Sequence, residues 1–216
     1  MTETAPKRRG RQAEAARNDQ RLLHAAREVI ATQGFDAPVS AIAERAGVGI
    51  GSLYRRYGSK VELLQRLCVL AMEQAITAAE TGLADENPWH GLTQYVQTCV
   101  AFHSGALAPL AGRIPTTPEM RETAARGFHL LDQLVERAPL RPDASSLDVA
   151  WLTELFARTH PRDADTDDAR VHARLLAIAL DGLRAGAQTP LPGPTPTREH
   201  YTRRWNKTPK QQHHSE

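Results

Sequence analysis

The chain has 216 residues, of which 41% are hydrophobic, 24% are charged and only 5% are aromatic. This balance is typical of a globular protein, and the low aromatic content disfavours a β-sandwich or barrel, so we expect an all-α fold. No apolar run approaches the roughly 18 residues of a membrane-spanning helix, and the polar N-terminal segment is unlike a signal peptide. These features exclude a membrane protein and predict a location in the cytoplasm.

The formal net charge of +2 conceals an uneven distribution. Residues 1–60 contain 11 Lys and Arg against 6 Asp and Glu, whereas residues 61–197 contain 11 against 17 and residues 198–216 contain 5 against 2. Positive charge at one end of the chain supplies the electrostatic part of binding to phosphates, and an acidic middle is repelled by them. The N-terminal quarter is therefore predicted to face nucleic acid.

The first third of the chain shows a basic segment followed by helical patterns. Residues 1–17 hold five Lys and Arg with almost nothing apolar, so we expect a disordered basic arm there. Apolar residues then recur with helical spacing within residues 22–30 and 39–46. Gly34 and Gly47 follow these runs, where left-handed C-terminal caps belong.

A third short helix is predicted over residues 50–57, with Leu53 and Tyr57 on its inner face. The sequence SKVE at residues 59–62 has the form of a capping box, in which a serine hydroxyl and a glutamate satisfy backbone amides at a helix start. A long fourth helix begins there, and its pattern fades at residues 85–86.

The later part of the chain, residues 65–189, is also predicted to be helical. A break at residues 115–118, which holds two prolines, separates one helix from the next. Two late helices, at 146–158 and 168–187, are expected to pair antiparallel. Residues 190–216 are rich in proline at first and have no periodicity, so we expect a flexible tail.

The motif that points to function lies within residues 18–64. A helix-turn-helix needs a short positioning helix, a turn containing glycine and an amphipathic recognition helix, and residues 41–57 meet these requirements in one run. The block IAERAGVGIGSLYRRYGSKVELL closely resembles the DNA-binding signature of the tetracycline-repressor-like (TetR) family. The resemblance extends over about residues 19–67.

The resemblance implies a transcriptional regulator with a three-helix DNA-binding domain and a variable helical C-terminal domain. In such proteins the C-terminal domain holds a small ligand, and the last two helices form a four-helix dimer interface. We expect a homodimeric repressor that a small, mostly apolar effector releases from a palindromic or near-palindromic double-stranded operator. An effector-independent DNA-binding protein of the same fold is the alternative.

The resemblance also implies which residues meet DNA. The turn and the start of the recognition helix approach base edges and backbone, while Tyr54 and Lys60 contact phosphates. Arg55 is the best candidate for bidentate reading of guanine, with Arg56 second, although an exposed arginine is often only a solvated charge. The expected contacts are Arg8, Arg11, Ser40, Gly49, Ile50, Gly51, Ser52, Tyr54, Arg55, Arg56 and Lys60. Where this chain has Gly49, a hydroxyl-bearing residue is common in the family, so a helix cap is expected to be missing.

Aromatic and polar residues of the later helices are candidates to line an effector pocket, which is usually apolar with a few polar groups. They are Trp89, Tyr95, Phe102, His103, Phe128 and Trp151. Packing in the core explains each of them at least as well.

The sequence lacks the constellations of an enzyme. It has no HExxH, no GxSxG and no phosphate-binding loop, so we expect no catalytic activity, no cofactor and no metal site. The only cysteines, Cys68 and Cys99, lie within helical patterns and are expected to be reduced packing residues. A metal or thiol sensor that uses them with His103 is a further alternative.

Overall fold

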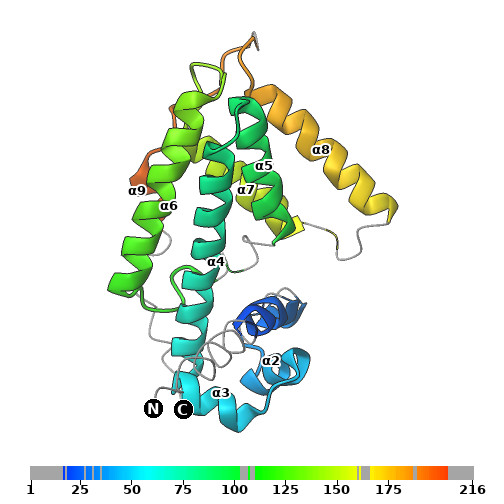
Figure 1. The fold of residues 1–216 in the computed structure, drawn as a ribbon, viewed down its shortest axis with the longest axis vertical. Coiled ribbons are helices and arrows are strands. Elements are labelled where there is room, and N and C mark those ends of the chain that lie inside the picture. Colours follow the sequence, from blue (N-terminus) through cyan, green and yellow to red (C-terminus); the bar gives the residue numbers. More distant parts are fainter. Residues whose placement is uncertain are drawn as a thin grey trace, which may run out of the picture. The chain divides into compact units, whose positions relative to one another are not determined.

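The structure is a computed structural model that describes residues 17, 19–26, 28–30, 32–34, 36–102, 107, 110–159, 161, 166–186 and 189–203. Across these ranges the fold is all-α, as predicted, and the β-structure is limited to an isolated bridge between Leu140 and Arg184. The helices are α2 (Val39–Ala46), α3 (Ile50–Tyr57), α4 (Lys60–Leu83), α5 (Pro88–Ala101), α6 (Pro118–Arg137), α7 (Ser146–Thr159), α8 (Asp167–Leu183) and α9 (Arg198–Thr202), labelled in Figure 1.

The chain divides into two compact units, Met1–Ala71 and Met72–Glu216, with the boundary inside α4. In the first unit, helical residues precede α2 at 19–26, 28–30 and 32–33. The predicted glycine caps are present, because Gly34 has a φ of 80° and Gly47 a φ of 65°, in the left-handed region that favours glycine. Of the predicted basic arm, only Arg17 lies among the described residues.

The core of the first unit is built from the inner faces of these short helices and of α4. It is made of large aliphatic side chains that are almost fully buried: Leu22, Leu23, Ile42, Leu53, Leu63, Leu64 and Leu67. The predicted capping box is half present, since the backbone N–H of Glu62 donates to Ser59 Oγ over 3.1 Å. The apolar spacing seen in the sequence thus places one face of each helix inward.

The second unit packs α5 against α6 and α7, with the C-terminal half of α4 contributing to the same core. Its buried side chains include Leu92, Val96, Cys99, Val100, Leu131, Leu134 and Val149. Helix α8 packs on α7 through His172, Leu176 and Leu180 and projects from the other helices of this unit (Figure 1). It ends at Leu183, earlier than predicted, because the chain turns there and Arg184 pairs with Leu140.

The C-terminal segment differs from the prediction of a flexible tail from residue 190 onward. Residues 190–203 lie against the second unit and include the helix α9, whose N-cap Thr197 forms a capping box with His200. The sequence suggested mobility because these residues have no apolar periodicity, but they are held by the backbone N–H of Leu191 and by the side chains of Arg198 and Tyr201. Residues 204–216 lie outside the described part.

No helix in the described part of the chain is long and apolar enough to cross a membrane.

Candidate nucleic-acid interface

The turn between α2 and α3 fixes the recognition helix. The backbone N–H of Gly47 donates to the carbonyls of Ala43 and Glu44, and the N–H of Val48 donates to Ala43 over 3.0 Å. Because Gly47 is left-handed, the chain reverses at once and starts α3 three residues later. Leu53 and Tyr57 of α3 are buried, as predicted, so the opposite side of this helix faces outward.

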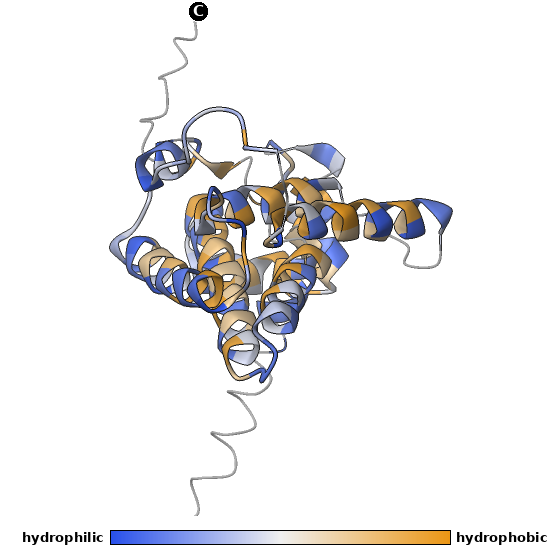
Figure 2. Ribbon diagram, turned by 90° about the horizontal axis from the view of Figure 1, so that it is seen from above, coloured by the Kyte–Doolittle hydropathy of each residue, from blue (hydrophilic) through white to orange (hydrophobic). Residues whose placement is uncertain are grey.

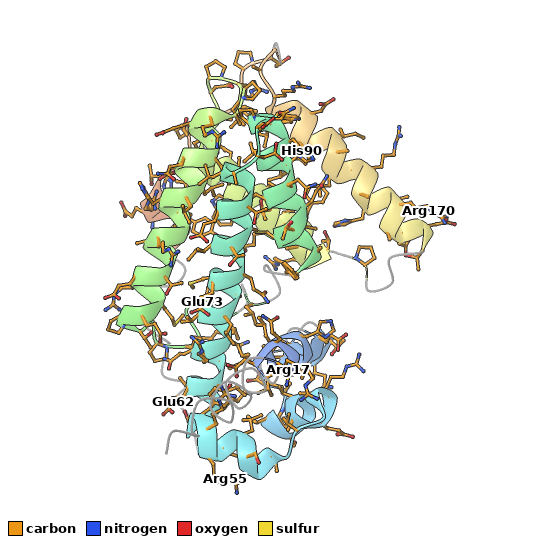
Figure 3. The ribbon with its side chains drawn as sticks, in the orientation of Figure 1. Arg17, Arg55, Glu62, Glu73, His90 and Arg170 are labelled. Carbon is orange, nitrogen blue, oxygen red and sulfur yellow. The ribbon has the colours of Figure 1, made fainter. Side chains whose placement is uncertain are left out.

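The outward side of α3 carries most of the predicted DNA contacts. Gly49, Ile50, Gly51, Ser52, Tyr54, Arg55 and Arg56 are all exposed. The Arg55 guanidinium donates to Ser52 Oγ over 2.9 Å, and Figure 3 shows Arg55 on the outer side of α3. A helix with small residues at its start and long polar side chains further on has the form that enters a major groove.

The start of α3 has no side-chain cap, as the glycine at position 49 led us to expect. The carbonyl of Gly49 accepts from the backbone N–H groups of Ser52 and Leu53, over 2.9 and 3.1 Å. The earliest amides of a helix have no acceptor within it, so an uncapped and exposed start offers its N–H groups to an anion such as a phosphate.

Gly51 is a glycine that the fold of this unit does not require. A Cβ built on it would meet only the Arg55 side chain, at 3.9 Å, which is ordinary van der Waals contact. Its backbone is not left-handed. A close approach to an external partner therefore explains this glycine better than internal packing does.

Arg56 is held by an acidic residue of the preceding helical stretch. Its Nη2 lies 2.8 Å from Asp19 Oδ1 and 2.9 Å from Oδ2, and the Tyr57 hydroxyl donates to Asp19 Oδ1 over 2.8 Å. Burial, together with the Asp19 carboxylate, raises the pKa of Tyr57 to about 12. Asp19 was not predicted as a functional residue from the sequence. Because its guanidinium is already bound, Arg56 is a weaker candidate for reading bases than Arg55.

Lys60 begins α4, and its ammonium donates to the Ala37 carbonyl over 2.8 Å. An ammonium has three N–H donors, so this bond joins the start of α4 to the loop before α2 and still allows a phosphate contact. Ser40 is exposed in the first turn of α2. Arg8 and Arg11, the two arm residues predicted to meet DNA, lie outside the described residues.

The comparison with known families agrees with this geometry. Residues 22–67 match the model of the bacterial regulatory proteins of the tetR family, a span that contains the whole helix-turn-helix and the Lys60 contact. The chain carries the N-terminal DNA-binding domain of the TetR family. It is accordingly a DNA-binding regulator of transcription. No curated protein matches the chain.

Solved TetR-family structures share the fold over most of the chain. The regulator SCO0520 from Streptomyces coelicolor is 24% identical, with 78% of this chain and 99% of that chain covered and a TM-score of 0.59. A TetR protein from Mycobacterium vanbaalenii is 25% identical, with 81% and 99% covered and a TM-score of 0.57. LfrR from Mycobacterium smegmatis, solved in complex with proflavine, is 20% identical, with 82% and 99% covered and a TM-score of 0.57.

The predicted pocket residues make different contacts. Phe128 and Trp151 meet the same ring, that of Tyr201, edge-on at centroid distances of 5.1 and 5.3 Å. Trp89 instead meets the Arg184 guanidinium, whose Cζ lies 5.3 Å from the Trp89 ring centroid. Phe102 is 45% exposed at the end of α5. His103 lies outside the described residues.

Tyr95 is buried in the core of the second unit. Burial raises the pKa of its hydroxyl well above the ordinary value, and the neighbouring Cys99 and Tyr201 raise it further. Two residues here were not predicted from the sequence: Tyr201, which lies in the predicted tail, and Glu154, whose carboxylate accepts from the Tyr201 hydroxyl over 3.3 Å. The structure thus gathers Tyr95, Phe128 and Trp151 near Tyr201.

Cys68 and Cys99 are both buried and form no disulfide within the described residues, which agrees with the predicted packing role. Among the residues that the structure describes, no three His, Cys, Asp or Glu side chains are grouped so that they could hold a metal ion.

Proposed function

We propose that the protein is a homodimeric repressor that a small, mostly apolar effector releases from a palindromic or near-palindromic operator. In this proposal residues 18–64 bind DNA and residues 65–189 hold the effector and the dimer interface. The observation that carries it is an apolar surface on the last two long helices, which we call the α7–α8 face. Its members are large hydrophobic side chains that are 38–59% exposed: Trp151, Leu155, Val171, Leu175 and Ile178.

Helix α8 is apolar on two opposite sides. His172, Leu176 and Leu180 face inward, while Val171, Leu175 and Ile178 recur at helical spacing on the outside. Figure 2 shows hydrophobic segments alternating with hydrophilic ones along the whole of this projecting helix. An apolar outer stripe of this length on a projecting helix favours a protein interface over a solvated surface.

A second copy of the same chain is the partner that best fits the α7–α8 face. Two helices from each of two copies can pack as a four-helix interface, and a twofold axis makes one patch complementary to itself. A twofold dimer presents two recognition helices to DNA. We expect them to bind half-sites about one helical turn apart, roughly 34–36 Å or a little more, and hence a palindromic operator.

The proposal that the protein responds to a small-molecule effector is supported by the group of aromatic side chains in the second unit. Tyr95, Phe128 and Trp151 supply apolar surface, and the buried Glu154 supplies a polar group, which together are the ingredients of a small-molecule site. LfrR, a protein with a similar fold, was solved with proflavine bound. We infer that this chain also responds to a small molecule.

The dimer is tested by analytical ultracentrifugation of wild type, Leu175→Asp and Ala177→Asp. Both positions are exposed on α8, but Ala177 lies off the apolar stripe, so it controls for the new charge itself. We expect wild type and Ala177→Asp to sediment as dimers and Leu175→Asp as a folded monomer, because an unpaired charge is costly at a buried interface. A wild-type monomer at micromolar concentration, or a dimeric Leu175→Asp, contradicts the proposed interface.

Operator binding is tested with DNA selected from a random pool, titrated with and without compounds that raise the melting temperature. We expect the selected sequences to be palindromic and at least one compound to weaken binding. Selection of non-palindromic DNA contradicts the symmetric dimer. If no compound that binds the protein alters operator affinity, the effector-independent alternative is correct.

A further inference from the structure

The C-terminal residues 189–203, which we call the C-terminal strap, are fixed to the second unit at their start. Arg141 donates to both carboxylate oxygens of Asp143, over 2.5 and 2.9 Å, and to the carbonyls of Gly182 and Thr189. The backbone N–H of Leu191 donates to Asp143 over 2.8 Å, and these bonds hold the pKa of Asp143 near 2. The strap therefore leaves the end of α8 in a defined direction.

The far end of the strap, α9, is held by two long side chains, Arg198 and Tyr201. The Tyr201 ring meets Phe128 and Trp151 edge-on, and its hydroxyl donates to Glu154. The Arg198 guanidinium lies 4.6 Å from the Phe128 ring centroid and donates to Asp132 over 2.8 Å. A helix of five residues has almost no stability by itself, so its position depends on these contacts.

The surface beneath α9 has the chemistry of a receptor for organic cations. It combines two aromatic rings, Phe128 and Trp151, with the carboxylates of Asp132 and Glu154, and we call these four residues the acidic aromatic site. The Glu154 residue is only 8% exposed. An aromatic face attracts a cation, and an adjacent carboxylate fixes its position. In this structure the site receives a phenol ring and a guanidinium from the chain itself.

We propose that the acidic aromatic site binds an aromatic organic monocation, and that α9 is its intramolecular competitor. A flat ring with an amidinium or ammonium group replaces both the Tyr201 ring and the Arg198 charge. Because a tethered segment competes at a high effective concentration, only a ligand that makes both contacts displaces it. This inference rests on the proposed function, for which it names the class of effector.

Trp151 links this competition to the rest of the molecule. One part of its ring lies against Tyr201, and the residue also belongs to the α7–α8 face. Replacing Tyr201 by a ligand changes the packing around a side chain of the proposed dimer interface. A ligand that binds the strap-free form better than the strapped form shifts the population toward it, as thermodynamic linkage requires.

The test is calorimetric titration of the full chain with benzamidinium, an aromatic amidinium ion, and with benzamide, its neutral analogue of the same shape. The competitor is weakened by the double substitution Arg198→Ala and Tyr201→Ala. Glu199→Ala is the matched control, because the Glu199 side chain is 81% exposed and pairs along the helix with Arg203. Asp132→Asn is added to the double variant to remove one carboxylate while keeping its shape.

We expect benzamidinium to bind the double variant at least about tenfold more tightly than wild type or Glu199→Ala, the size of one strong cation contact. The double substitution should not raise the affinity for benzamide. Adding Asp132→Asn to the double variant should remove most of the gain in affinity for benzamidinium. Equal binding of benzamidinium to wild type and double variant, in proteins with native circular dichroism, overturns the proposal. So does equal binding of benzamide and benzamidinium.

The same proteins are then titrated with operator DNA. If benzamidinium binds as expected but leaves operator affinity unchanged, the cation site stands and the proposed effector response fails. If benzamidinium does not bind but other compounds release the operator, the acidic aromatic site fails and the proposed function stands.

Discussion

The backbones of Gly82 and Gly91 touch where α4 and α5 cross. A Cβ built on Gly91 would lie 2.1 Å from the Gly82 carbonyl oxygen, and one built on Gly82 would lie 2.5 Å from the Gly91 carbonyl oxygen. Real Cβ atoms do not approach backbone so closely, so neither glycine accepts a side chain without separating the two helices. The pair sets the spacing of α4 and α5 in the second unit.

Gly91→Ala is therefore expected to lower the free energy of unfolding by about 1–3 kcal/mol, the usual cost of an overpacked core. Gly127→Ala in α6 is the control, because its Cβ would meet only Ile76 at an ordinary 3.6 Å. There the better helix propensity of alanine should leave stability equal or raise it by up to about 1 kcal/mol. Urea denaturation of the two variants measures both effects, and an unchanged Gly91→Ala contradicts the close crossing.

The raised pKa of Tyr57 leads us to expect a loss of folding stability at alkaline pH. Its pKa is about 12 in the folded protein, above the ordinary value of about 10, because burial and Asp19 disfavour the phenolate. The stabilisation is fully present below pH ~10 and is lost as the pH rises through ~12, since the unfolded chain ionises first. By pH ~11 wild type should lose about 1 kcal/mol relative to Tyr57→Phe. Parallel denaturation curves at pH 9 and 11 check this difference.

Local signals explain why the DNA-binding unit could be predicted in detail. Gly34 and Gly47 mark turns within a few residues of the helices they end, and the spacing of Leu53 and Tyr57 identifies the inner face of α3. Asp19 escaped prediction because its partners Arg56 and Tyr57 are 37 and 38 residues away in the chain. Nothing in the local pattern distinguishes this aspartate from a solvated one.

The second unit was predictable as a set of helices but not as a site. The contact between Gly82 and Gly91 depends on how two helices cross, which apolar spacing does not specify. Tyr201 contacts residues that lie 47 or more positions earlier in the chain, and the strap that carries it has no apolar periodicity. The pocket residues were chosen by type alone, and residue type does not indicate that Phe128 and Trp151 meet Tyr201 whereas Trp89 meets Arg184.

Arg55 and Arg56 are expected to differ although they are neighbours on α3. Arg55→Ala should leave stability unchanged and relax the preference at one base pair, worth about 1–3 kcal/mol of discrimination. Arg56→Ala should lower the melting temperature, because it leaves the nearly buried Asp19 carboxylate without its cation. Binding to a panel of operators with single base changes, together with melting curves, separates the two effects. A destabilised Arg55→Ala with unchanged base preference would reverse the assignment.

Gly51→Ala isolates the close approach of α3 to DNA from the stability of the fold. The added methyl group has room in the free protein, where it meets only the Arg55 side chain at 3.9 Å, and alanine is the better helix former. The melting temperature should therefore stay the same or rise.

If the α3 backbone lies against the groove wall, the same methyl group must push the helix outward and lengthen every contact made by its first turn. We expect operator affinity to fall at least about tenfold, with a similar loss on non-cognate DNA if the obstruction is at the phosphates and a smaller one if it is at a base edge. Gly193→Ala is no suitable control, because Gly193 has a φ of 79° and alanine is strained there, whereas Gly127→Ala keeps both helix and space. Fluorescence anisotropy of labelled operator with wild type, Gly51→Ala and Gly127→Ala gives the comparison, and equal affinity of all three would place the α3 backbone away from DNA.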